Sequence, residues 1–417
     1  MSVERAGMIS VDTASVGAFL EERHHDWAAT ASTFASAELE ARAEPADDAA
    51  GRREARNLLA ALGEGGLLAP IGARDLRACC LAREAVAAAS PLADAVWALQ
   101  GLGITPLLLA GTDEQRARWA EPALAGRAMG AFAMTETNAG SDVASLTTRA
   151  VRDGDDWVLD GAKTLISNAG IADYYVTFAS TEPERGSRGI TAFLVPANTL
   201  GLDFVGPQVM SAAHPLGALR FAACRVPGSA VIGEQGAGFK LGMATLDQLR
   251  PTVGAAACGM ARRALDEALG HALRREQFGK LLADFQIVQD KLGRMAIDLD
   301  AARLLVYRAA WAKDVGAERI TLEAAMAKAF ATEAAQRIID EGVQILGGRG
   351  VLAESVVDRL YRSIRALRIY EGTTEIQHLI VAGRILADAR ERGRERGGGR
   401  EDGGRDEAGG PAGGSRA

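Results

Sequence analysis

Apolar residues recur along this chain with two different periods. From about Val11 to Arg127, alanine and leucine return every three or four residues, which is the period of an amphipathic helix. The same period returns near residue 233 and holds to about Ala389. Between these parts, short β-branched and aromatic runs are separated by turn-forming residues, as in strands. The pattern predicts an α+β protein with a helical N-terminal domain (1–127), a β domain (128–232) and a C-terminal helical domain (233–390).

Single elements can be predicted inside these parts. Asp153-Gly154 and Asp160-Gly161 are hairpin-type turn signals on either side of a strand at 157–159. In the first helical part, Thr112 and Gln115 have the spacing of a capping box. Further strands are expected at 174–178, 190–195 and 219–221.

The C-terminal part carries the longest single pattern. Between Val288 and Val306, apolar residues alternate steps of four and three, which predicts one apolar seam on a long helix of a bundle. From residue 391 the chain is glycine and charge without aliphatic anchors, so residues 391–417 are predicted to be a disordered tail. Acids and arginines balance there, which disfavours a basic arm for nucleic acid.

Composition narrows the functional classes. A net charge of -7 and a pI near 5.5 argue against a nucleic-acid partner. The four cysteines show no metal-ligand spacing and are interpreted as reduced thiols, which suits the cytoplasm. The N-terminus lacks the apolar core of a signal peptide, and no apolar run looks long enough to span a bilayer, so no membrane is expected. The histidines lack metal spacing and no Gly-x-Ser-x-Gly elbow occurs, which disfavours a metal site and serine hydrolysis.

Residues 368–377 contain Glu371, the carboxylate that the sequence favours most as a general base. Glu371 stands directly before Gly372, and Ile369 and Tyr370 could form a dry wall that raises the pKa of the carboxyl towards that of a general base. Gly372 would let a flat ligand approach the backbone. A polar turn between two helices is the simpler alternative for an isolated Glu-Gly pair.

Four other clusters suit a planar, polar ligand. Small residues and hydroxyls fill 131–142 and 163–170, although an ordinary loop and a strand end explain them equally well. Arg274 beside Phe278 could clamp a pyrophosphate and a stacked base, or could lie at a solvated helix end. The Gly-x-Gly-x-x-Ala spacing within 346–353 follows helical residues, so a Rossmann nicotinamide site is not expected.

Taken together, the order and spacing of these clusters resemble the acyl-CoA dehydrogenase family from about residue 55 to 388. The resemblance implies a helical N-terminal domain, a central β domain and a C-terminal four-helix bundle. It also implies FAD as cofactor and assembly as a homotetramer. The motifs that carry it are Thr135-Glu136, Ala139-Gly140-Ser141-Asp142, Ile166-Ser167-Asn168, Arg274 with Gln277-Phe278-Gly279, Leu346-Gly347-Gly348 and Tyr370-Glu371-Gly372-Thr373.

By resemblance, two segments hold the flavin ring and other residues contact the rest of FAD. Thr373 and Glu375 would reach the flavin nucleotide in their own subunit. The residues implied for the FAD of a neighbouring subunit are Arg274, Phe278, Gln344, Gly347 and Gly348. The residues implied around the flavin ring are Phe132, Met134, Thr135, Ser141, Leu165, Ile166 and Ser167.

The resemblance also implies a reaction. Glu371 would take the α-proton of an acyl thioester while the β-hydrogen leaves as hydride, giving a trans-2-enoyl thioester. The backbone N–H of Glu371 would stabilise charge on the thioester oxygen. Electrons would pass to an electron-transferring flavoprotein. The residues implied to contact the acyl-CoA are Ser141, Asp247, Arg250, Tyr370 and Gly372.

Several positions depart from the family pattern. One branch places its base at the position of Leu249, and leucine cannot accept a proton, so Glu371 is the base expected here. Glu375, one helical turn later, could raise the pKa of Glu371 by repulsion. Three residues differ from those usual in the family: Thr137 stands for proline, Leu165 for tryptophan and Val351 for an aromatic residue.

Two alternatives to an acyl-CoA dehydrogenase stay open at this point. One is dehydrogenation of an acyl group bound to a carrier protein in a biosynthetic pathway. The other is a non-catalytic relative that keeps the fold. The glycines and alanines between Pro251 and Met260 also suggest that one helix leaves room for a bulky acyl group.

Overall fold

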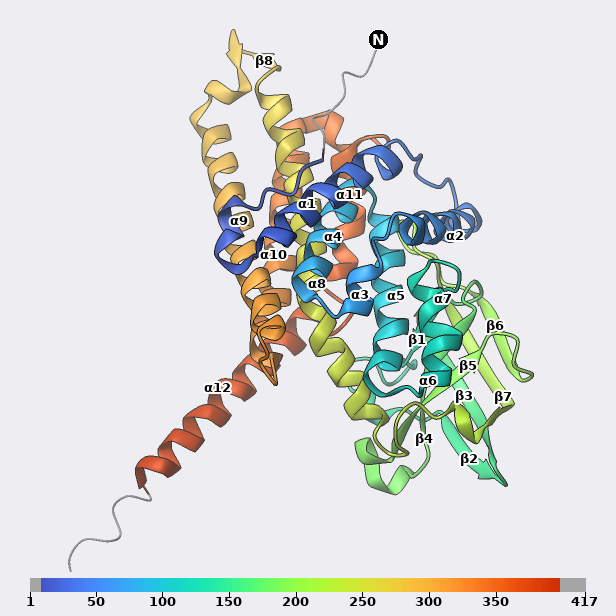
Figure 1. Cartoon of the computed structure of the whole chain (residues 1–417). Coiled ribbons are helices and arrows are strands. Elements are labelled where there is room, and N and C mark those ends of the chain that lie inside the picture. The colour runs from blue at the N-terminus through green and yellow to red at the C-terminus, as the bar shows by residue number, and fades with distance from the viewer. Residues whose placement is uncertain (1–8, 398–417) are drawn as a thin grey trace, which may run out of the picture.

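The computed structural model describes residues 9–397. The two helical parts precede and follow the β part in the sequence, but in space they pack together and the β part lies at one side (Figure 1). This arrangement confirms the predicted α+β class. The N-terminal part contains α1 (Glu22–Phe34), α2 (Asp48–Glu64), α3 (Ala69–Ala73), α4 (Leu76–Ala89), α5 (Pro91–Ala110), α6 (Asp113–Gln115) and α7 (Glu121–Leu124).

Polar caps fix where several of these helices begin. The predicted capping box is confirmed: the Gln115 N–H donates to Thr112 Oγ1 at 3.2 Å, and the Thr112 N–H donates to Gln115 Oε1 at 3.0 Å. Side chains of Asp47, Asp75 and Ser90 accept amide hydrogens at the starts of α2, α4 and α5. Each cap satisfies a backbone donor that would otherwise lack an intrahelical partner.

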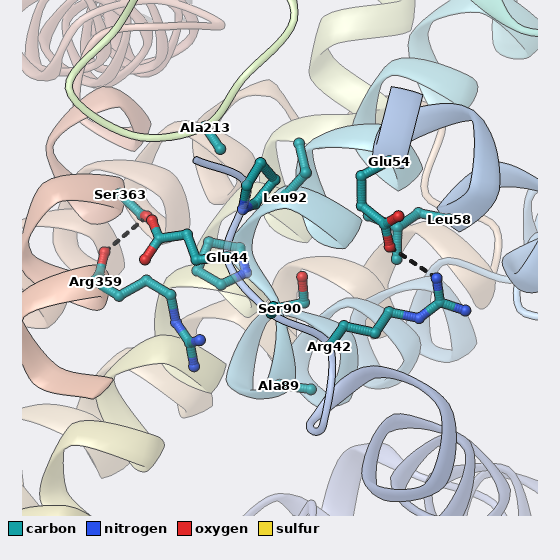
Figure 2. Close-up of a pocket in the computed structure, with 13 residues that line it drawn as sticks. Arg42, Glu44, Glu54, Leu58, Ala89, Ser90, Leu92, Ala213, Arg359 and Ser363 are labelled. Atoms are coloured by element: carbon teal, nitrogen blue, oxygen red, sulfur yellow. Dashed lines mark hydrogen bonds and ion pairs between the residues drawn. The ribbon is translucent and has the colours of Figure 1, made fainter. Parts of the chain in front are cut away.

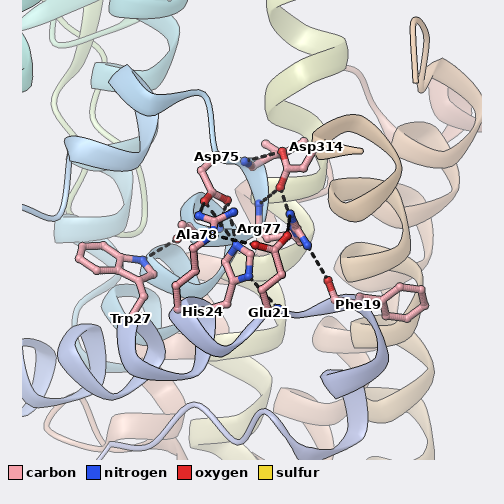
Figure 3. Close-up of polar contacts among 10 residues, drawn as sticks. Phe19, Glu21, His24, Trp27, Asp75, Arg77, Ala78 and Asp314 are labelled. Atoms are coloured by element: carbon pink, nitrogen blue, oxygen red, sulfur yellow. Dashed lines mark hydrogen bonds and ion pairs between the residues drawn. The ribbon is translucent and has the colours of Figure 1, made fainter. Parts of the chain in front are cut away.

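A polar cluster ties the N-terminal helices to the C-terminal part (Figure 3). Asp75 accepts the Ala78 N–H at 3.0 Å and lies 3.3 Å from His24 Nε2 on α1. Arg77 Nε donates to Asp314 at 2.9 Å, which connects α4 to the end of α9 (Gln286–Asp314). Because these groups are mostly buried and paired, we interpret the cluster as structural.

The central part is one mixed sheet with strand order β1-β4-β2-β3-β7-β6, and β5 pairs with β4. β1 runs parallel to β4, while the β2–β3, β3–β7, β4–β5 and β6–β7 pairs are antiparallel. All four predicted strand segments lie inside strands. The strands are β1 (Gly130–Ala133), β2 (Arg149–Asp153), β3 (Asp156–Ser167), β4 (Tyr174–Ser180), β5 (Ile190–Pro196), β6 (Leu202–Pro207) and β7 (Leu216–Pro227).

One of the two predicted hairpin turns is wrong. Asp153-Gly154 does join β2 to β3, with Gly154 at φ 63°. Asp160-Gly161 instead lies inside β3, where the pairing with β7 shifts register. A Cβ at Gly161 would lie 2.5 Å from Thr148 Oγ1, so glycine permits a close crossing of strands here rather than a turn.

The C-terminal part is helical and is built on three long helices that pack against one another. α8 and α9 are joined at their tip by the β8–β9 hairpin, and α12 extends away from the body (Figure 1). Along the predicted seam of α9, Met295, Leu299, Ala302 and Val306 are buried. The remaining elements are α8 (Gly238–Ala272), β8 (Glu276–Gln277), β9 (Lys280–Leu281), α10 (Thr321–Leu346), α11 (Val356–Leu367) and α12 (Thr374–Gly397).

Two predictions about chain segments are wrong. α12 continues to Gly397, so residues 391–397 are helical and not disordered; residues 398–417 lie outside the described part. By length and composition, α5 is apolar enough to cross a membrane, contrary to the prediction that no such run exists. It packs against α2, α4, α8 and β1, and 83% of its most apolar stretch is buried, which is the environment of a core helix.

The small residues between Pro251 and Met260 do not leave room for an acyl group. A Cβ at Gly254 would lie 2.7 Å from a Val306 methyl, and one at Gly259 would lie 2.0 Å from the Glu84 carbonyl oxygen. These glycines therefore allow close helix packing, and the predicted space is already filled.

Candidate active site

Glu371 lies in a tight turn between α11 and α12. Its φ is 55° and that of Gly372 is 95°, so two successive residues adopt the left-handed conformation. Such a conformation is unusual for glutamate and is held only where the surroundings enforce it. Gly372 is also required by space, because a Cβ there would lie 2.4 Å from Gln377 Nε2.

Three buried side chains hold the two carbonyl groups of this turn. Arg250 Nε donates to the Glu371 carbonyl oxygen at 3.1 Å, and Gln377 Nε2 donates to the same atom at 3.1 Å. Gln377 also donates to the Gly372 carbonyl oxygen at 3.1 Å, and Lys328 Nζ donates to it at 2.7 Å. Because all three donors are at most 4% exposed, the turn is rigidly positioned.

The carboxyl group of Glu371 is largely shielded from water. Its Oε2 atom is buried and has no hydrogen-bond partner among the described residues. Burial raises the pKa of Glu371, Asp94 adds to this by repulsion, and the cations Arg83, Arg250 and Lys328 oppose the rise. The raised pKa moves the group towards the range of a general base that works near neutral pH.

The predicted influence of Glu375 is wrong. Glu375 is exposed, and its own pKa is lowered, with hydrogen bonds from its backbone N–H and from Thr373 as the main causes. The acid that raises the pKa of Glu371 is Asp94 on α5. Thr373 Oγ1 accepts the Ile376 N–H at 3.4 Å, so Thr373 helps to cap the start of α12.

A buried ion pair lies behind the base. Arg83 donates from Nε and Nη2 to Asp94, both at 2.8 Å, and from Nη1 to Thr252 Oγ1 at 2.9 Å. The guanidinium lies 5.5 Å from the ring centre of Trp97. Burial and the nearby Asp94 raise the pKa of Tyr370, which keeps its hydroxyl protonated.

Sequence reasoning missed Arg83, Asp94, Lys328 and Gln377. Asp94 and Lys328 had a signal in the sequence, because each is a charged residue within an otherwise small or apolar helical stretch, such as Ala325 to Phe330 around Lys328. Arg83 and Gln377 have polar neighbours and gave no such signal. A charged residue in such a stretch is rarely buried unless it is paired.

The two residues predicted to form a dry wall beside Glu371 differ in burial. Ile369 is 52% exposed and contributes little to such a wall, whereas Tyr370 is half-buried and packs against the main core. A separate apolar cluster joins α5 to α8, and Phe132 of β1 packs against it. Leu249, the position of the alternative base, belongs to this cluster and directly precedes Arg250. The buried members of the cluster are Ala98, Leu99, Leu102 and Leu249.

The two segments predicted to hold the flavin ring lie side by side. The Thr164 N–H donates to the Thr135 carbonyl oxygen at 3.0 Å. Lys163 Nζ donates to the Met134 carbonyl oxygen at 3.1 Å and to Glu136 Oε1 at 2.8 Å. Burial opposes ionisation of Glu136, but Lys163 and several hydrogen bonds prevail and lower its pKa to about 2. This buried ion pair fixes the relative position of the segments.

These segments present an open face to a ligand. Thr135 is half-buried, and its hydroxyl group has no hydrogen bond within the described part of the chain. Leu165 adopts φ 54° and is 55% exposed. Ser141 is exposed, and nothing lies within 4 Å of a Cβ placed at Gly140. A flat ligand can therefore approach both the backbone and the hydroxyl groups here.

Met134 and Ile166 were predicted to contact the flavin ring, but their side chains are buried, so only their backbone atoms are available to it. Met134 is 5% exposed, and its methyl group would lie 2.4 Å from a Cβ at Gly242. Ile166 is 2% exposed and belongs to the core of the sheet. Phe132 is half-buried and packs against Phe178, with the ring centres 4.8 Å apart and the ring planes tilted by 56°.

The residues predicted for a neighbouring subunit are exposed and far from Glu371. Phe278 is 95% exposed on the β8–β9 hairpin, and Arg274, Gln344, Gly347 and Gly348 are also exposed. Lys328, which contacts the Glu371 turn, precedes Gly347, the residue that caps the end of α10, by 19 residues, or about 28 Å at 1.5 Å per residue. The helix therefore places Gln344, Gly347 and Gly348 away from the Glu371 turn of the same chain.

Four of the predicted substrate residues lie in or next to the Glu371 turn: Tyr370 and Gly372 belong to it, Arg250 donates to its carbonyl oxygen, and Asp247 pairs with Arg250. Arg250 forms an ion pair with Asp247, and Asp247 Oδ2 accepts the Thr321 hydroxyl at 2.5 Å. A hollow lined by Ser145, Thr147, Arg149, Ser180 and Gly186, among others, begins three residues after Ser141.

A second cleft is unrelated to these residues. It lies between the N-terminal helices and α11, and Figure 2 shows its lining. Arg42 pairs with Glu54 at 2.8 Å, and Glu44 pairs with Arg362 at 3.2 Å, so most of its charge is neutralised locally. None of the predicted site residues lines it.

Comparison with known families gives three matches in chain order. Residues 21–127 match the family described as "Acyl-CoA dehydrogenase, N-terminal domain". Residues 131–224 match "Acyl-CoA dehydrogenase, middle domain", and residues 236–386 match "Acyl-CoA dehydrogenase, C-terminal domain".

Similar proteins are found by sequence and by structure. The human mitochondrial short-chain specific acyl-CoA dehydrogenase is 43% identical over 295 residues, covering 69% of this chain and 70% of that protein. The butyryl-CoA dehydrogenase of Megasphaera elsdenii superposes with a TM-score of 0.82 at 32% identity, covering 88% of this chain and 99% of that one. A chain from a structural study of the electron transferring flavoprotein of Acidaminococcus fermentans gives a TM-score of 0.83 at 32% identity, covering 88% and 98%.

Proposed function

The chain belongs to the acyl-CoA dehydrogenase family, and from this premise we propose that it converts an acyl-CoA thioester into the trans-2-enoyl-CoA. It is an oxidoreductase, and the members of its family are FAD-dependent flavoproteins. The observation that carries the proposed reaction is the single buried, unpartnered carboxylate oxygen of Glu371 in a turn held by Arg250, Lys328 and Gln377.

The residues present fit FAD. The open face of Thr135, Gly140 and Leu165 leaves hydroxyl and backbone groups free for the ring. When bound, FAD supplies an acceptor for the β-hydrogen as hydride. Arg274 and Phe278 would contact the FAD of a neighbouring subunit, because they are exposed at the β8–β9 hairpin, at the end of the C-terminal part opposite to α12 (Figure 1).

Glu371 acts as the base in this proposal. Its Oε2 takes the α-proton of the thioester, and the electron pair of that C–H bond becomes the new C=C bond as the β-hydrogen leaves with its own pair. The Glu371 N–H forms no hydrogen bond within the described residues, so it is available to the thioester oxygen as charge develops there. Arg250 and Gln377 hold the carbonyl of the same residue, which orients both groups at once.

The apolar cluster of Ala98, Leu99, Leu102 and Leu249 would face the acyl chain, and the hollow after Ser141 would receive the polar part of CoA. The similarity to proteins named for short-chain and butyryl substrates makes four-carbon acyl-CoA the first substrate to test. Arg149 and the hydroxyl groups of Ser145, Thr147 and Ser180 line the hollow and suit a charged ligand.

Purified protein should be yellow and should lose its flavin colour anaerobically when a suitable acyl-CoA is added. A series from four to sixteen carbons, about as wide as acyl chains commonly run, identifies the length that bleaches fastest. In Glu371→Gln the rate of bleaching should fall at least about a thousandfold while FAD content is kept. A Glu371→Gln protein that bleached at the wild-type rate would remove Glu371 from the mechanism.

We also propose an electron acceptor, an oligomeric state and a cellular compartment for this protein. We expect an electron-transferring flavoprotein as acceptor, which similarity to a chain from the Acidaminococcus fermentans study supports. Exposed apolar side chains on α9 and α12, such as Ile297 (70%) and Leu379 (67%), support burial in a homotetramer. Four free, buried thiols agree with a cytoplasmic protein. Bleaching by a carrier-bound acyl group but not by acyl-CoA would favour the biosynthetic alternative.

A further inference from the structure

His214 contacts one of the residues proposed to meet the flavin. Its Nε2 atom lies 2.7 Å from Ser167 Oγ, at the end of β3. His214 belongs to the loop between β6 and β7, and nothing in the sequence singled it out. The contact places an imidazole next to the hydroxyl group of a half-buried residue, two positions after the exposed Leu165.

The backbone on both sides of this contact is fixed. The Asn168 N–H donates to the Pro215 carbonyl oxygen at 2.7 Å, and Ser167 pairs with Leu216 in the β3–β7 register. Asn168 is 2% exposed, and its side chain donates to the Gly130 carbonyl oxygen at 3.0 Å. His214 and Ser167 are therefore held together by the residues that follow each of them, and the contact is built into the sheet edge.

The imidazole is uncharged. Burial lowers the pKa of His214 to about 4, and no ionisable neighbour contributes to that shift. A neutral imidazole has one nitrogen that accepts and one that donates. Bonds donated by a hydroxyl group centre near 2.7–2.8 Å, whereas bonds donated by N–H centre near 2.9–3.0 Å. With the ring proton on Nδ1, Nε2 is the acceptor, and the 2.7 Å contact is then a bond donated by Ser167 Oγ–H.

We propose that His214 is a positioning residue that takes the hydroxyl hydrogen of Ser167 and so makes the outward side of Ser167 Oγ a hydrogen-bond acceptor towards the flavin ring. This inference rests on the proposed flavin contact of Ser167. An acceptor at that point favours the reduced ring, which carries an additional N–H, over the oxidised ring. The predicted consequence is that His214 raises the reduction potential of the bound cofactor.

The test is the reduction potential of the FAD-loaded protein, measured anaerobically against a reference dye, together with its FAD content. In His214→Leu the hydroxyl group of Ser167 is released, so the ratio of reduced to oxidised flavin at a fixed potential should fall about tenfold. That ratio corresponds to a shift of about 30 mV to more negative potential for a two-electron couple. His214→Gln, whose amide oxygen can accept the same hydrogen, should restore at least half of the shift.

Controls separate this effect from general damage. His25→Leu replaces an exposed histidine on α1 and should leave the potential unchanged. In a Ser167→Ala background, His214→Leu should cause no further shift, because the hydroxyl group through which it acts is missing. An unchanged potential in His214→Leu with full FAD content, or an equal shift in both backgrounds, overturns the proposal.

If His214→Leu loses FAD, the reduction potentials of Ser167→Ala and His214→Gln decide whether the proposal holds. The proposal requires Ser167→Ala to shift the potential downward about tenfold in ratio and His214→Gln to stay nearer the wild type; the reverse order overturns it. Failure of the proposed function would show differently, since wild-type protein would then bind no FAD or would not be bleached by any acyl-CoA.

Discussion

Replacing Lys328 by methionine should move the pH dependence of proton abstraction. Lys328 is fully buried, and its charge lowers the pKa of Glu371 against the larger effect of burial. Methionine keeps the length and apolar stem but removes the charge. The pKa of Glu371 should therefore rise beyond its already raised value.

The magnitude follows from the position of the charge. Lys328 Nζ is held 2.7 Å from the carbonyl oxygen of the residue after Glu371, and a nearby opposite charge shifts a carboxyl pKa by about one unit. One unit corresponds to about 1.4 kcal/mol. Glu371 works when ionised, so activity is lost as the pH falls through its pKa. In Lys328→Met that loss should occur about one pH unit higher, with rates about tenfold lower on the acidic side.

The assay is the rate of anaerobic flavin bleaching by a saturating acyl-CoA across the pH range. On the alkaline plateau the variant should approach the wild-type rate, because Gln377 still holds the Gly372 carbonyl group at 3.1 Å. Lys240→Met, at an exposed position on α8, is the matched control and should leave the profile unchanged. A uniform loss of rate at every pH would refute the electrostatic reasoning and leave Lys328 a purely structural role.

Three further changes test the surroundings of the site. Asp94→Asn should lower the free energy of unfolding by about 3–5 kcal/mol, measured by denaturant titration, because it leaves Arg83 as an uncompensated buried charge. Glu136→Gln should lower the free energy of unfolding by about 3 kcal/mol near neutral pH, since the folded pKa of Glu136 is about 2 against an ordinary value of 4.5. In the wild type this contribution is lost between pH 4.5 and 2, and a variant with the same acid sensitivity as the wild type would contradict it. Gly372→Ala should lower the bleaching rate at least about tenfold with FAD retained, because its Cβ would displace Gln377 in a left-handed turn; an unchanged rate would show that the turn tolerates the shift.

Much of the fold could be predicted because it depends on local patterns. The capping box at Thr112 and the seam ending at Val306 follow from residue spacing alone. The turn predicted at Asp160-Gly161 is wrong because Gly161 is required by the close approach of Thr148, which lies on a different segment of the chain. The glycines at 254 and 259 mislead for the same reason, since their neighbours come from α9 and α4.

In the candidate site, too, local features could be predicted, whereas contacts between distant segments could not. Glu371 could be singled out from its own neighbours in sequence, but the groups that set its pKa come from α4, α5, α8 and α10. Arg83 is 288 positions before Glu371, and no local pattern relates the two. The role proposed for His214 could not be predicted from the sequence, because its contact with Ser167 depends on the pairing of β3 with β7.

The position of α12 has a mechanical consequence for the turn described above. The helix begins at Thr374, three residues after Glu371, and extends away from the body with Leu379, Ile385 and Leu386 at least half exposed (Figure 1). A partner that covered these side chains would hold a helix that begins three residues after Glu371. In the proposed homotetramer, assembly would thereby restrain the turn, so dilution to single subunits should slow flavin bleaching before it unfolds the chain.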